Sequence, residues 1–221
     1  MSTAPVRTAL DYLLHRPATA ADGAPVAVLL HGRGSHKGDL QGLKPMLPAA
    51  WTVVTPEAPF AGSTWGYGAG SAWYRYVQDD RVVPATLEES LARLDQFLGE
   101  LARVVGFQPG PLVLGGFSQG GTTSLAYALS RPGSVVAVLN FSGFLVADAK
   151  LDESGASPPD TPIFWGHGVG DPAIPISLAE VGRNRLRRAR AKLVARDYRI
   201  GHWIADEEVA AAVAMVEDEG L

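Results

Sequence analysis

Short apolar segments and longer amphipathic segments alternate along the chain. Unbroken apolar runs of this kind are typical of parallel strands, which are buried on both faces. The predicted inner strands are residues 26–30, 51–55, 111–114, 135–139 and 162–165. Two further strands are predicted at 6–14, where Leu10, Tyr12 and Leu14 lie two residues apart, and at 192–198.

Segments with helical spacing separate these strands. Thr86 and Glu89 have the spacing of a capping box, and leucines recur at helical intervals from there to Leu101. Alternating strands and helices predict an α/β fold, with a mostly parallel twisted sheet flanked by helices. No repeat, linker or composition shift marks a boundary, so we expect one domain over 1–221, without a separate lid domain. The other predicted helices are residues 121–130, 177–190 and 205–217.

Composition narrows the classes of function. The chain has 221 residues, 47% hydrophobic and 19% charged, which is typical of a globular protein. Its net charge of −4 disfavours nucleic-acid binding, because phosphate neutralisation needs clustered positive charge. The absence of cysteine excludes disulfides, thiolate metal sites and a cysteine nucleophile. There is no secretory signal pattern and no apolar run of about 20 residues, so we expect a cytoplasmic protein without integral membrane contact.

One segment has the pattern of a nucleophile elbow. The sequence from Gly116 to Gly120 is G-F-S-Q-G, the only G-x-S-x-G in the chain, and it lies between a predicted strand and a predicted helix. In such a strained turn the serine is presented at a helix N-terminus, and glycines avoid steric clashes around it. Ser118 is therefore the predicted nucleophile.

A serine nucleophile needs a base and an acid, which in this fold follow it in the order acid, then histidine. Of the five histidines, only His202 follows both Ser118 and an acidic residue at the end of a predicted strand. Asp171 follows the strand 162–165 through a Gly-rich turn and is the predicted acid. Asp197 lies within a strand and is predicted to be structural. No metal or cofactor is expected.

Two further sets of residues complete the predicted site. The oxyanion hole needs two N–H donors, which we assign to the main chains of Gln119 and Arg33, because such holes draw one donor from the loop after the early strand. Aromatic side chains gather in the Gly-rich segment 61–76, and such loops commonly surround the sites of α/β sheets. The candidate substrate-binding residues are Trp65, Trp73 and Tyr74.

Five motifs together resemble the phospholipase/carboxylesterase family of α/β-hydrolases, which includes acyl-protein thioesterases. They are H-G-R-G (31–34), S-A-W-Y (71–74), G-F-S-Q-G-G (116–121), H-G-V-G-D-P-A-I-P (167–175) and Y-R-I-G-H-W-I (198–204). The resemblance implies a lidless α/β-hydrolase that cleaves small-molecule carboxylic esters or thioesters of short-to-medium acyl chains without a cofactor, as a monomer or homodimer. Members best known for deacylating proteins carry an apolar residue at the position of Arg33, so the resemblance favours the branch that acts on small esters.

Two other functions stay open at this point. Gly32, Gly34 and Gly38 follow a strand, and Glu57 lies 19 residues later, as in a dinucleotide-binding oxidoreductase, although Pro45 interrupts the helix that should follow. The chain could also be a non-catalytic binding protein with a hydrolase fold. The six basic residues in 183–192 are interpreted as a solvated helix face.

Overall fold

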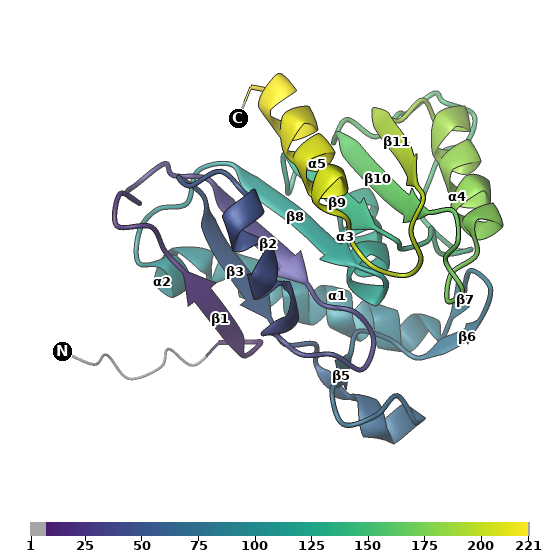
Figure 1. Ribbon diagram of the computed structural model, residues 1–221, viewed down its shortest axis with the longest axis horizontal. Helices are drawn as coiled ribbons and strands as arrows, with labels where there is room; N and C mark the ends of the chain where they lie inside the picture. Colours follow the sequence, from purple (N-terminus) through teal and green to yellow (C-terminus); the bar gives the residue numbers. More distant parts are fainter. Residues whose placement is uncertain (1–7, 221) are drawn as a thin grey trace.

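The computed structural model describes residues 8–220, which contain a central seven-stranded sheet (Figure 1). Its strand order is β1-β3-β2-β8-β9-β10-β11, with β1 antiparallel to β3 and all other neighbours parallel. The predicted α/β architecture is confirmed. The strands are β1 (Tyr12–His15), β2 (Val26–Leu30), β3 (Thr52–Pro56), β8 (Leu112–Phe117), β9 (Ala137–Phe141), β10 (Ile163–Gly168) and β11 (Leu193–Tyr198).

Helices cover both faces of this sheet. In Figure 1, α5 crosses in front of the sheet and α1 lies behind it. The inner strands alternate apolar side chains between the two layers: Val28 packs with the helices behind, whereas Ala27 belongs to the cluster under α5. The helices are α1 (Pro84–Gly99), α2 (Leu101–Val105), α3 (Gln119–Ser130), α4 (Ile176–Arg188) and α5 (Asp206–Asp218), with a 3-10 helix η1 (Asp39–Met46).

The segment between β3 and α1 contains only short elements. It forms two antiparallel strand pairs and a 3-10 helix, and it protrudes below the sheet in Figure 1. Both pairs are built from strands of two or three residues. The elements are β4 (Phe60–Ala61), η2 (Gly62–Trp65), β5 (Ser71–Ala72), β6 (Tyr76–Gln78) and β7 (Arg81–Val82).

Two details of the predicted elements are wrong. The first strand covers Tyr12–His15 rather than 6–14, and residues 6 and 7 of the predicted strand lie outside the described part. Thr86 does not cap α1, because the helix begins two residues earlier at Pro84, whose missing N–H costs nothing there. The Thr86 hydroxyl instead bonds to the carbonyl of Val83.

The basic segment of α4 is not simply a solvated face. The Arg183 side chain is buried, and its guanidinium bonds to the Asp197 carboxylate at 2.5 Å and to the carbonyl of Trp165 at 3.0 Å. Conversely, the apolar Val181 of the same helix is 52% exposed. The reason is position along the helix: Val181 lies where α4 passes the cavity described below, and Arg183 lies over the β10–β11 edge, where Asp197 supplies an opposite charge.

Candidate active site

The predicted site residues converge at the carboxyl ends of the parallel strands. Ser118 follows β8, Arg33 follows β2, and Asp171 follows β10 by three residues. His202 lies between β11 and α5. Sites of open α/β sheets form at this edge because the strand-to-helix loops gather there.

Ser118 occupies a strained turn between β8 and α3. Its φ of 54° and ψ of −115° are outside the ordinary regions for a residue with a side chain. The turn closes only because its neighbours lack side chains. A Cβ on Gly116 would lie 2.5 Å from the carbonyl carbon of Gly120, and a Cβ on Gly120 would lie 1.9 Å from the carbonyl oxygen of Leu30.

His202 links the serine and the aspartate. Its Nε2 lies 3.0 Å from the Ser118 Oγ, and its Nδ1 lies 2.6 Å from Oδ2 of Asp171. The Phe117 ring packs against the imidazole with a centroid separation of 4.6 Å. The three side chains therefore form a continuous hydrogen-bonded chain, and Phe117 restricts the ring between them.

Main-chain groups hold the Asp171 carboxylate. Asp171 is buried, and its Oδ1 accepts the N–H groups of Ala173 at 2.8 Å and Ile174 at 2.9 Å. These bonds leave Oδ2 to face His202. The two main-chain bonds therefore fix the orientation of the carboxylate.

A second histidine, which sequence reasoning did not assign to the site, supports the turn that bears the aspartate. His167 Nε2 donates to the carbonyl of Ile174 at 2.8 Å and lies 3.6 Å from Oδ2 of Asp171. Burial lowers the pKa of His167, which keeps this ring neutral. The order of residues along the chain contains no signal for this contact, because His167 lies before the acid.

The two candidate oxyanion donors border the same cavity as Ser118. Within residues 8–220, neither the N–H of Arg33 nor that of Gln119 has an acceptor. The Gln119 N–H is at the first residue of α3, where helix geometry leaves N–H groups free and the helix dipole favours negative charge.

A cavity of about 480 Å³ opens above these groups. Its volume is within the usual range for small-molecule sites. The lining combines polar groups near Ser118 with apolar side chains from the loop after β9 and from α4. The apolar lining residues are Tyr74, Phe117, Phe144, Ile174, Leu178 and Val181.

Only one of the three candidate aromatic residues lines this cavity. Tyr74 does so, with its ring otherwise buried. Trp73 is a correction: it is fully buried beneath the cavity, where its indole N–H donates to the carbonyl of His31 at 2.9 Å. Trp65 is also a correction, because it lies outside the lining and packs instead against Phe60 at 4.9 Å. Trp73 and Tyr74 lie in the bend that follows β5, where one of the two neighbours borders the cavity and the other does not.

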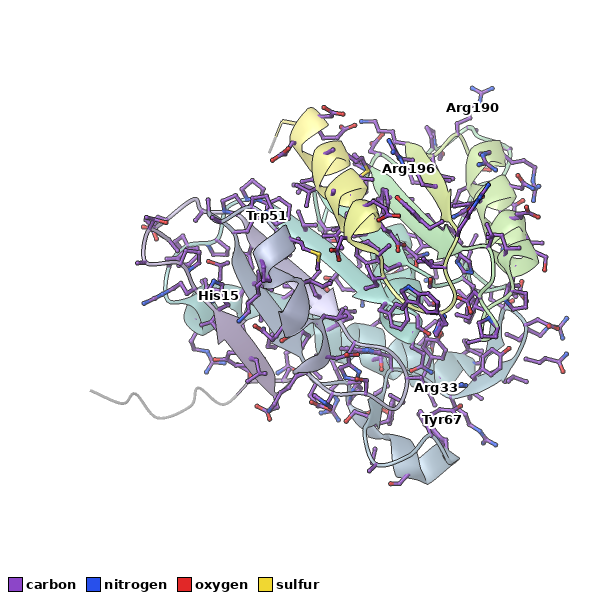
Figure 2. The ribbon with its side chains drawn as sticks, viewed as in Figure 1. His15, Arg33, Trp51, Tyr67, Arg190 and Arg196 are labelled. Atoms are coloured by element: carbon purple, nitrogen blue, oxygen red, sulfur yellow. The ribbon has the colours of Figure 1, made fainter. Side chains whose placement is uncertain are left out.

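The guanidinium of Arg33 lies at the cavity and over aromatic rings. Its Cζ is 4.9 Å from the centroid of Tyr67 and 5.9 Å from that of Tyr76, and Figure 2 shows Arg33 beside Tyr67. Asp39 and Asp79 line the same cavity. The contacts with these two rings therefore hold the Arg33 guanidinium at the cavity.

The described residues bear on three other possibilities: a metal site, a dinucleotide site and a membrane-spanning helix. Residues 8–220 contain no group of three His, Asp or Glu side chains placed to hold a metal ion. The segment after Gly38 is the 3-10 helix η1, with Pro45 inside it, instead of the α-helix that would receive a dinucleotide phosphate. None of the described helices combines the length and apolarity needed to cross a bilayer.

Comparison with known proteins gives consistent relatives. The family model described as Phospholipase/Carboxylesterase matches residues 18–217. Acyl-protein thioesterase 1 of Saccharomyces cerevisiae is 32% identical over 167 residues, covering 68% of this chain and 72% of the relative. A probable carboxylesterase of Oryza sativa subsp. japonica is 26% identical over 218 residues, covering 91% and 80%. The crystal structure of esterase PE8 superposes with a TM-score of 0.78 at 27% identity, covering 95% of this chain and 98% of that one.

Proposed function

The chain belongs to the phospholipase/carboxylesterase family of α/β-hydrolases, and we propose that it cleaves carboxylic esters through an acyl-enzyme intermediate on Ser118. The relatives carry the names of ester-bond and thioester-bond hydrolases. The observation that carries the mechanism is the chain of side-chain contacts from Ser118 through His202 to Asp171, at 3.0 Å and 2.6 Å.

Acylation begins with attack of the Ser118 Oγ on the ester carbonyl. His202 Nε2 accepts the hydroxyl proton, and Asp171 stabilises the imidazolium that forms. The carbonyl oxygen becomes an oxyanion that the N–H groups of Arg33 and Gln119 bind. Collapse of the tetrahedral intermediate breaks the bond to the alkoxy oxygen, and His202 returns the proton to the departing alcohol.

Deacylation repeats these steps with water. Nε2 of His202 takes a proton from water, whose oxygen attacks the acyl carbonyl. The second tetrahedral intermediate uses the same two donors, and its collapse releases the carboxylic acid and restores the Ser118 hydroxyl. No cofactor takes part in this scheme.

The proposed substrates are small-molecule esters of short-to-medium acyl chains. Apolar side chains line one part of the cavity, where an acyl chain would be removed from water, and about 0.8 kcal/mol is gained for each buried methylene. The volume of about 480 Å³ suits a chain of this size. Because a relative is named a thioesterase, acyl-thioesters are the second class to test.

Replacement of Ser118 by alanine tests the mechanism. We expect Ser118→Ala to lose at least about 10⁴-fold in kcat on p-nitrophenyl esters, because members of a triad act as a unit. A fluorophosphonate probe should label the wild type at Ser118 and leave the folded variant unlabelled. A panel from acetate to palmitate, with matching thioesters, gives the preferred acyl length. Labelling of a different serine would refute the assignment.

A further inference from the structure

Residues 71–74, here named the strap, contact the loop that carries Arg33 on both sides of that residue. After it, the Ser71 N–H donates to the carbonyl of Ser35 at 2.7 Å, and the Gly34 N–H donates to the carbonyl of Ser71 at 2.9 Å. Before it, the Trp73 indole N–H donates to the carbonyl of His31 at 2.9 Å. The strap thus fixes the main chain on either side of Arg33.

The strap also bonds to the side chain of Gln119. Oε1 of Gln119 accepts the N–H of Trp73 at 2.9 Å, and Nε2 donates to the carbonyl of Tyr74 at 2.8 Å. Gln119 is only 4% exposed, so these bonds are not shared with bulk water. Its amide satisfies one main-chain donor and one acceptor, as a neighbouring strand would, and it connects the strap to the first residue of α3.

The strap is itself held by the core. Trp73 and Tyr74 are fully buried, and the Ser90 hydroxyl of α1 donates to the carbonyl of Trp73. Ala72 pairs with Phe60 in the β4–β5 pair. A segment with this many buried contacts has little freedom to move, so it can serve as a fixed reference for the groups bound to it.

We propose that the Trp73 indole and the Gln119 side-chain amide are positioning residues that hold the N–H groups of Arg33 and Gln119 in the geometry of the oxyanion hole. The proposal rests on the proposed function, since it assumes that these two N–H groups bind the oxyanion. Donors stabilise a transition state only if they are already oriented when charge develops. The two donors lie 86 residues apart in the chain, and the strap is the segment that bonds to both of their elements.

Two variants remove these bonds without deleting either oxyanion N–H. Trp73→Phe removes the indole donor, and Gln119→Met removes the amide while keeping a side chain of similar length. We expect kcat on p-nitrophenyl butyrate to fall about 10–100-fold, less than the roughly 10²–10³-fold for a donor removed outright. KM should stay within about threefold, because the ground-state ester does not depend on the donors.

A transition-state analogue separates positioning from general stability. The Ser118 hydroxyl adds to the carbonyl of an alkyl trifluoromethyl ketone, and the adduct places an oxyanion in the hole. The Ki of this inhibitor should therefore rise by the same factor by which kcat/KM falls. Trp51→Phe is the matched control, since Trp51 is a buried tryptophan just before the amino end of β3, away from the carboxyl ends of the strands where the candidate site lies (Figure 2). We expect it to lower the melting temperature without changing kcat or Ki.

The outcomes distinguish the proposal from the function on which it rests. If either variant is folded by circular dichroism and keeps kcat and Ki within about twofold of wild type, the strap does not position the hole. A fall in kcat without a matching rise in Ki also overturns the proposal. If the wild type neither hydrolyses esters nor labels at Ser118, the proposed function fails instead.

Discussion

The two sides of the candidate site are built from different parts of the polypeptide. On the acid–base side, Ser118, His202 and Asp171 contact one another through side-chain atoms. On the oxyanion side, the proposed donors are the main-chain N–H groups of Arg33 and Gln119, and the bonds around them come from other segments. The first side depends on residue type, whereas the second depends on where the main chain runs.

Under the proposed function, this difference explains why position 33 accepts an arginine. A main-chain donor places no demand on the side chain, so the guanidinium can lie over Tyr67 and Tyr76 at the cavity. Asp171, by contrast, uses both carboxylate oxygens: Oδ1 accepts two main-chain N–H groups, and Oδ2 faces His202. We therefore expect side-chain substitutions to damage the acid–base side most.

The largest of these expected effects is that of Asp171→Asn. The amide oxygen must remain on the N–H groups of Ala173 and Ile174, so the amide NH₂ faces Nδ1 of His202. The ring must then carry its proton on Nε2, where it cannot accept one from Ser118. We expect kcat to fall about 10⁴-fold without loss of fold. Steady-state kinetics measure this. Asp160→Asn, at an exposed aspartate, is the control, and Asp171→Asn retaining kcat within tenfold would contradict the triad.

A smaller effect is expected from Arg33→Pro, which removes the main-chain donor. Loss of one donor should lower kcat by roughly 10²–10³-fold on a neutral ester. Arg33→Ala keeps the N–H and should leave kcat on that ester within about tenfold, with KM changing mainly for anionic substrates. Circular dichroism checks that the proline variant is folded. Equal inactivity of both variants would mean that the side chain itself takes part in the reaction.

The smallest expected effect is on the free energy of unfolding, through residues that hold the two sides of the site in place. The oxyanion side is anchored by Trp73 and Gln119, which do not titrate. The segment bearing His202 leads into α5, where the buried Glu208 accepts the N–H of Ala205 at 3.3 Å. Burial raises the pKa of Glu208 from 4.5 to about 7, with Arg183 opposing and Glu207 adding to the shift.

Proton linkage determines whether the free energy of unfolding rises or falls with pH. The folded state binds the Glu208 proton more tightly than the unfolded state, so the stability it confers is complete below pH 4.5 and is lost as pH rises through about 7. A shift of this size corresponds to roughly 3 kcal/mol in the free energy of unfolding. Urea unfolding at pH 5.5 and 8.5 should show a drop in the wild type that is reduced in Glu208→Gln. Glu207→Gln, at the exposed neighbour that makes the smallest contribution to the shift, should keep most of the wild-type drop, and an unchanged drop in Glu208→Gln would refute this assignment.

Hydrophobic periodicity was enough to predict most of the sheet and its helices. Five inner strands and four helices were predicted within a few residues, because runs such as 26–30 are apolar on both faces and no other element suits them. The prediction does not include the last three residues of β8, 115–117, since Gly115 and Gly116 carry no side-chain pattern. Strand pairing with β2 and β9 extends the strand through them.

The roles of aromatic and charged residues were less predictable. Trp65, Trp73 and Tyr74 look equivalent in a Gly-rich segment, yet only Tyr74 lines the cavity. Arg183 looks like one of several solvated cations, but it is buried against Asp197. Contacts with other segments decide two of these outcomes, because Trp73 donates to the carbonyl of His31 and Arg183 bonds to Asp197.

By itself, the amino-acid sequence determined which side chains are available for the proposed chemistry, their order along the chain, and the alternation of strands and helices. These properties are local, because they follow from residue type and from the spacing of apolar side chains over a few turns. Only the tertiary structure decided that the strap joins the Arg33 loop to Gln119, and that His167 and Phe117 brace the acid and the imidazole. Most of these contacts join groups tens of residues apart, and they exist only once the sheet has brought its carboxyl-terminal loops together.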